Sequence, residues 1–240
     1  MSALGHYLEE EGISTVAIAL IRKQAEHTRP PRALWVPFEL GRPIGPPSEA
    51  AFQTRVILAA LGLLEAPKQA SLIVDFPDDD PREALDPKWR PPIASAAAPE
   101  GPAEIAEAVE AELRALAAAY AASCTARERS TVGVSGLPPV ACGEYLAAWL
   151  RGKRPASPVA DMSLALALRF AIDDLKAFAL EAALRAGTKP SSKQLGDWLW
   201  NVTALGAALQ VLRQNCLAGD DERLKAVAAF FVPALRVPAG

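Results

Sequence analysis

Hydrophobic and polar positions follow two different patterns in the first third of the chain. Ser2–Glu11 spaces Leu4, Tyr7 and Leu8 on one face, as an amphipathic helix does. Ile13–Ile21 is instead almost uniformly apolar and rich in β-branched residues. This second pattern predicts a strand that is buried on both faces of a parallel sheet.

Helix-like and strand-like segments continue to alternate as far as residue 76. It predicts a short helix or turn at Arg22–Thr28, strands at Ala33–Pro37 and Ser71–Phe76, and between them a helix that Ser48 caps. Helices alternating with strands indicate an α/β fold, here a partial doubly wound, mostly parallel sheet. Because the first helix follows no strand, we expect another chain to supply the missing strands.

Residues 77–102 interrupt this pattern with seven prolines and the acidic run at 78–80. Proline at this density prevents a continuous helix, so an extended linker is predicted, with Trp89 anchoring it on a surface. The predicted organisation is an α/β segment over 1–76, this linker, and a mainly α-helical region over 103–240.

Helical periodicity dominates the last region. The predicted helices are Ala103–Ser123, Pro138–Leu150, Met162–Ala186, Lys193–Leu217 with Ser191 or Ser192 as its cap, and a short one over 220–236 that ends near Pro233. The segment Ser130–Ser135 is predicted as a short strand.

Composition and charge argue against several classes of function. Hydrophobic residues make up 51% of the 240, the net charge is −3, and no basic patch is evident, which argues against nucleic-acid binding. No charge-free apolar run reaches the ~20 residues that span a bilayer. Three cysteines without metal or redox spacing predict a reducing, cytoplasmic location and no cofactor.

The most specific local signal is the segment 33–47 (ALWVPFELGRPIGPP), a strand that enters a loop of glycine, proline and arginine. Gly41 and Gly45 permit close approach of a ligand or another chain, and Phe38 and Glu39 flank them. Arg32 and Arg42 can hold a small anionic substrate through two hydrogen bonds. The alternative is a rigid proline turn with solvated arginines.

Other polar and aromatic residues give weaker signals. His6 and His27 are interpreted as surface residues, and no cluster has metal-ligand spacing. Asp173 and Asp174 are expected to form structural ion pairs with Lys176 or Arg169.

Trp198 and Trp200 cannot share a helix face, so one is expected to point into the core and the other towards a partner, unless both are buried. Cys142 lies in the first turns of a helix, where the dipole favours a thiolate, and is the one cysteine with a candidate catalytic role.

From Leu8 to Leu64 the sequence contains, in order, LEEEGISTVAIAL, RPPRALWVPFELGRPIGPP and FQTRVILAALGLL. This order resembles the selenoprotein B family of glycine, sarcosine, betaine and D-proline reductases. Members carry an "EEAGIPTV" strand entry and a "PPRALFVPFPLGHPLG" strand and loop. The matching residues are Glu11, Gly12, Ile13, Thr15, Val16, Pro30–Leu34, Val36–Phe38, Leu40, Gly41, Pro43 and Gly45. Arg42 stands where members often have histidine.

In that family a selenocysteine or cysteine upstream of the helix corresponding to Ser2–Glu11 cleaves a C–N bond, with a second cysteine nearby. No cysteine precedes Cys124 here. The resemblance therefore implies an accessory oxidoreductase subunit, which contributes pocket and interface surface to a thiol- or selenol-bearing partner in a hetero-oligomer. The alternative is a non-catalytic scaffold or dimerisation protein in a homo-oligomer, and an independent enzyme using Cys142 or a metal is a third.

Overall fold

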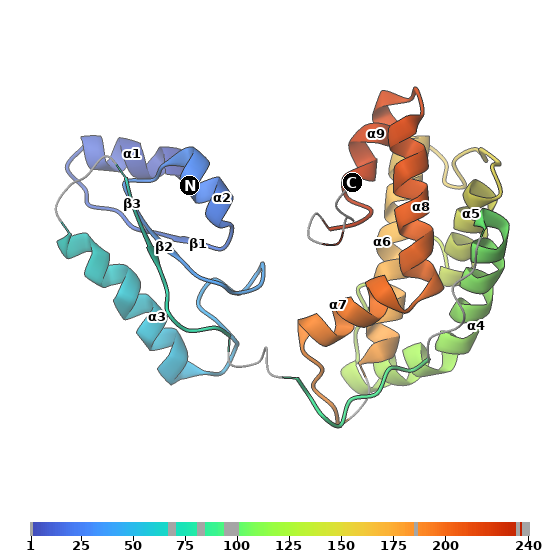
Figure 1. Cartoon of the computed structure of the whole chain (residues 1–240), viewed down its shortest axis with the longest axis horizontal. Helices are drawn as coiled ribbons and strands as arrows, with labels where there is room; N and C mark the ends of the chain where they lie inside the picture. The colour runs from blue at the N-terminus through green and yellow to red at the C-terminus, as the bar shows by residue number, and fades with distance from the viewer. Residues whose placement is uncertain are drawn as a thin grey trace. The chain divides into compact units, whose positions relative to one another are not determined.

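A computed structural model describes residues 2–66, 71–80, 85–93, 101–184, 187–233 and 236. The chain divides into two compact units, unit 1 over Met1–Ala84 and unit 2 over Leu85–Gly240 (Figure 1). The division falls inside the predicted linker, and the described residues 85–93 belong to the helical unit.

Unit 1 contains a small parallel sheet. Its elements are α1 (Ser2–Glu10), β1 (Ala17–Ala19), α2 (Arg22–Thr28), β2 (Arg32–Trp35), α3 (Ala50–Gly62), the 3-10 turn η1 (Leu63–Glu65) and β3 (Leu72–Asp75). The strand order is β1-β2-β3, with Leu34 of β2 opposite both Ile18 and Val74. The predicted sequence of helices and strands and the parallel pairing are both confirmed.

The two faces of this sheet are covered differently. Leu34 and Val36 lie in a small buried core with Val56 and Ala60 of α3. On the other face, Arg22 of α2 lies over the Trp35 ring. Figure 1 shows α1 and α2 on one side of the sheet and α3 on the other.

Two predictions for unit 1 are wrong in detail. β1 is only half-buried, because it is the outer strand of the described sheet and no described strand pairs with its other edge. Ser48 does not cap α3: it has φ +65°, whereas a capping residue needs an extended backbone. Glu49 occupies the cap position without a side-chain bond.

Unit 2 is built from helices in its described part. They are α4 (Pro102–Arg127), α5 (Pro139–Leu150), α6 (Leu164–Ala183), α7 (Ser192–Asn201), α8 (Ala204–Ala218) and α9 (Glu222–Ala228). Fully buried leucines from α4, α5, α6 and α8 form the centre of its core. Trp89 is buried against this core and donates its indole N–H to the Ala183 carbonyl at 3.0 Å, which confirms its predicted anchoring role.

The predicted helix over 193–217 is two helices. Ser191 caps α7 in a reciprocal capping box with Gln194, as one of the two predicted caps. The chain then turns at Val202, and the Thr203 side chain caps α8 by accepting from the Gly206 N–H at 2.9 Å. A Cβ at Gly206 would lie 2.1 Å from the Leu199 carbonyl oxygen, so glycine permits α8 to pack closely against the end of α7.

The strand predicted at Ser130–Ser135 is absent from this described segment. Its N–H groups pair with a carboxylate instead of a neighbouring strand: Asp174 on α6 accepts from Gly133 and Val134, at 2.7 and 3.0 Å. It also accepts from the N–H and the hydroxyl of Ser135. The β-branched residues of this segment are typical of a strand, but its backbone N–H groups donate to the Asp174 side chain of a helix that is distant in sequence.

Candidate functional site

A cavity of about 730 Å³ lies along the outer edge of β1. Pockets for small molecules are typically about 300–1,000 Å³ and mostly apolar. Five consecutive residues, Ala17 to Ile21, form its strand side. The rest of the lining comes from α1, α2, the start of β2 and the following loop: Ser2, Ala3, His6, Gln24, Ala25, His27, Thr28, Pro30 and Leu40.

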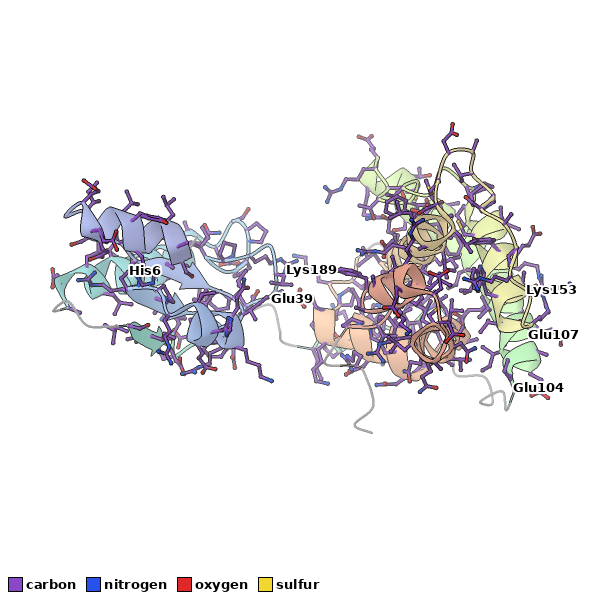
Figure 2. The ribbon with its side chains drawn as sticks, turned by 90° about the horizontal axis from the view of Figure 1, so that it is seen from above. His6, Glu39, Glu104, Glu107, Lys153 and Lys189 are labelled. Carbon is purple, nitrogen blue, oxygen red and sulfur yellow. The ribbon has the colours of Figure 1, made fainter. Side chains whose placement is uncertain are left out.

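The polar groups of this cavity come from the two helices beside β1. His6 lies on α1 (Figure 2) and His27 on α2, and both are exposed. Neither imidazole has a hydrogen-bond partner in the described part of the chain. The hydroxyls of Ser2 and Thr28 meet at 2.9 Å and join the two helices. None of the described residues that line the cavity is Asp, Glu, Lys or Arg.

The glycine-proline loop contributes one side chain to the cavity, Leu40, which is 73% exposed. Phe38 instead enters the core, where its ring packs against Phe52 and Phe76 at centroid distances of 5.5 and 5.9 Å. Gly45 is buried with φ +91°, and a Cβ there would lie 2.5 Å from the Phe52 ring. The close approach predicted for this glycine is therefore made to an internal aromatic ring.

Gly41 differs from Gly45. It is exposed with φ +93°, and a Cβ there would meet no atom within 4 Å. The Glu39 carbonyl accepts from the Arg42 N–H at 3.0 Å, which closes the turn that contains this glycine.

The two arginines predicted to hold an anion are engaged within unit 1. Arg32 is buried, pairs with Glu9 at 2.5 Å and donates to the Ala66 carbonyl at 3.2 Å. The Arg42 guanidinium lies 4.0 Å from the carboxylate of the buried Asp80. Neither arginine lines the cavity. We assign Arg32 a structural role, while the binding role of Arg42, whose side chain is 41% exposed, stays a prediction.

Sequence reasoning missed the two histidines as a pair. Each was interpreted as an isolated surface residue, but α1 precedes β1 and α2 follows it, the two helices contact each other, and residues of both line the same cavity as β1. The sequence does contain a signal for this pair: one histidine lies in the helix before an apolar strand and the other in the helix after it. This pattern predicts that both histidines lie near the same edge of the strand.

The candidates in unit 2 are buried. Trp198 is 3% exposed and Trp200 is 8% exposed, which agrees with the alternative that both lie in the core. Trp200 is covered because α8 folds back on the end of α7. Neither indole is therefore an exposed interface anchor.

Cys142 is also fully buried, with its Sγ 3.4 Å from the Ser135 hydroxyl. Burial raises the pKa of this thiol, so the predicted helix-dipole stabilisation of a thiolate does not prevail.

The carboxylates on α6 have structural partners. Asp173 pairs with Arg169 and Lys176, as predicted for this residue. Asp174 and Glu181 instead bind the loop before α5, Glu181 through Thr131 and Ser130. Burial raises the pKa of Glu181, but hydrogen bonds from these residues and Arg127 outweigh it and hold the pKa below its ordinary value.

The described residues contain no group of three or more His, Cys, Asp or Glu that could hold a metal ion. Among the helices that the structure describes, none combines the length and apolar character needed to cross a membrane. No family model, curated protein or solved structure matches the chain, so the resemblance over Leu8–Leu64 stays a prediction.

Proposed function

We propose that this chain is the accessory subunit of a reductase-like complex, and that a partner chain brings the thiol or selenol. The observation that supports this proposal is the position of the cavity on the unpaired edge of β1. A partner that covers this edge encloses the cavity and faces its contents. The chain then supplies the wall of a pocket for a small molecule, and the partner supplies the reactive group.

The positions of the cysteines support a redox group that a partner chain supplies. The three cysteines of the sequence are Cys124, Cys142 and Cys216, all in unit 2. Burial raises the pKa of Cys142, and that of Cys216 to about 11. Because the thiolate is the nucleophile, neither is suited to reductive chemistry at neutral pH. The same reduced cysteines support a cytoplasmic location.

The exposed apolar surface of unit 1 supports a partner. Among the described residues, nine of the fifteen large apolar side chains that are exposed belong to this smaller unit. Ile13 and Ile21 flank β1 and are 54% and 47% exposed. We propose that unit 1 is part of a doubly wound sheet and that strands of the partner continue it beyond β1.

Affinity purification from the native host, followed by mass spectrometry, tests this function. We expect a stoichiometric protein that carries a redox cysteine or selenocysteine. Ile21→Asp places a charge at the exposed β1 edge and is expected to release that protein. Val140→Asp, at a 61% exposed position of unit 2, is the matched control and should retain it. Recovery of this chain alone, as a homo-oligomer, overturns the proposal.

A second function, a non-catalytic dimerisation or scaffold protein, is favoured by α3. This helix is apolar on both sides: Val56 and Ala60 face the sheet, while Ile57, Leu58 and Leu61 are 41–61% exposed. A helix that is apolar all round is normally buried, and a second copy of the chain supplies a symmetric cover. Light scattering of the wild type and of Leu58→Glu distinguishes the two: loss of a dimer in the variant supports this second function.

A further inference from the structure

We propose that the cavity beside β1 binds a small amphipathic carboxylate, with His6 and His27 holding the carboxylate group. The apolar body of the ligand then lies along β1. This inference goes beyond the proposed function, because it concerns a ligand site on this chain alone and holds whether or not a partner brings a redox group.

The apolar part of the site is provided by the strand and the residues around it. Ile18 and Leu20 of the β1 segment, Ala25 of α2 and Leu40 of the loop all line the cavity. Burial of an alkyl or aryl group against these side chains contributes in proportion to the area removed from water. The volume of about 730 Å³ accommodates a body well beyond a few carbon atoms.

The anion-binding part is provided by imidazoles. His6 and His27 project from different helices onto one cavity, and no described residue uses their nitrogen atoms. A protonated imidazole donates from both nitrogen atoms and carries the positive charge that a carboxylate requires. The arginines expected to do this, Arg32 and Arg42, do not line the cavity, and Arg32 is paired with Glu9.

The lining also defines what is excluded. Because the described lining contains no Asp or Glu, an ammonium group finds no counter-charge among these residues, so a free amino acid is a poor ligand. Because the same described residues include no Lys or Arg, they do not neutralise a multiply charged phosphate either. The remaining class is a monocarboxylate with an apolar tail.

The chain is suited to a direct test, since His6 and His27 are its only histidines. In ¹H–¹³C NMR spectra of the full chain, the two imidazole signals therefore report on this cavity alone. We expect octanoate at pH 6.5 to shift both signals saturably, and octanol to bind about tenfold more weakly because it lacks the charge. Octylammonium should leave both signals in place.

Variants distinguish the effect of the two imidazoles on binding from the effect of any nearby positive charge. His6→Gln and His27→Gln change exposed positions, and circular dichroism checks that each variant folds. Each is expected to weaken octanoate binding about fivefold to tenfold. Ala3→Trp fills the cavity from the exposed side of α1 and should abolish binding without altering either histidine. Lys23→Gln removes a positive charge from α2 outside the lining and should leave binding within about twofold.

Two results overturn the proposal: the absence of saturable shifts with octanoate, or equal affinity for octanoate and octanol. The first removes the ligand site, and the second leaves an apolar cavity without an anion site. Neither result bears on recovery of a thiol- or selenol-bearing partner, so failure of this inference is distinguishable from failure of the proposed function.

Discussion

The guanidinium of Arg32 and the carboxylate of Glu9 meet inside unit 1, with Nη1 2.5 Å from Oε1 and both side chains at most 8% exposed. The pair joins the last turn of α1 to the start of β2. Glu9 also accepts from the Thr15 N–H at 2.6 Å, just before β1. One carboxylate therefore holds the helix, the edge strand and the central strand together.

This arrangement predicts a specific dependence of unit 1 on pH. The Thr15 N–H foremost, and then Arg32, hold the pKa of Glu9 below its ordinary value, against the opposing effect of burial. A depressed carboxyl pKa stabilises the fold above the unfolded-state pKa of about 4.3, and this contribution is lost as pH falls through the lower folded-state pKa. We expect Glu9→Gln to remove this acid-dependent step.

Amide hydrogen exchange of the segment 14–36 between pH 3 and 6 measures the effect. The wild type should lose protection towards the acid end, and Glu9→Gln should be less protected at pH 6 with a flatter profile. Glu10→Gln, at an exposed position on the same helix, is the control and should follow the wild type. Identical profiles for wild type and Glu9→Gln would contradict the assignment.

Asp174 is expected to be essential for the stability of unit 2. It is fully buried and accepts four hydrogen bonds from residues 133–135. Asp174→Asn turns an amide donor towards N–H donors, and we expect a loss of about 2–3 kcal/mol in the free energy of unfolding. The adjacent Asp173→Asn breaks only half-exposed ion pairs and should lose less than about 1 kcal/mol.

Urea denaturation of the two variants and the wild type gives these values directly. Equal losses for Asp173→Asn and Asp174→Asn would show that the loop before α5 does not depend on the Asp174 carboxylate.

Local patterns were sufficient to predict most elements. The apolar runs near residues 18, 34 and 73 became parallel strands, because a short strand needs little beyond β-branched and apolar residues in sequence. Helix ends were predictable where a cap carries a side-chain acceptor, as at Ser191. Ser48 is the counter-example, since two prolines precede it and its backbone adopts a left-handed conformation that no residue preference revealed.

Long-range partners were not predictable from the sequence. Asp174 and Ser135 are 39 residues apart, and an aspartate in a helix has the same sequence signature whether it meets solvent or a buried loop. Arg32 follows two prolines and looks solvated, but its partner Glu9 lies 23 residues earlier. The residues of the candidate site were not predictable for the same reason, because they depend on which helices lie near the edge of β1.

The two glycines of the loop after β2 should respond differently to alanine. Both have positive φ, so Gly41→Ala is expected to lower stability by about 1 kcal/mol. At Gly45 the added Cβ also meets the Phe52 ring at 2.5 Å, and displacement of the Phe38–Phe52–Phe76 cluster should raise the loss to about 3 kcal/mol. Hydrogen exchange of β2 and α3 measures both, and a Gly45→Ala loss no larger than that of Gly41→Ala would contradict the packing.

Cysteine reactivity provides a final prediction, which concerns unit 2. Cys142 and Cys216 are buried and their thiol pKa values are raised, whereas Cys124 on α4 is half-buried. Since thiolate character and access govern reaction with disulfide reagents, the native chain at pH 8 should react rapidly at about one thiol and at all three only after denaturation. Cys124→Ser should abolish the rapid phase, and Cys142→Ser should leave it unchanged. A rapid phase that depends on Cys142 would instead restore this residue as a candidate nucleophile, and the chain would no longer need an external thiol.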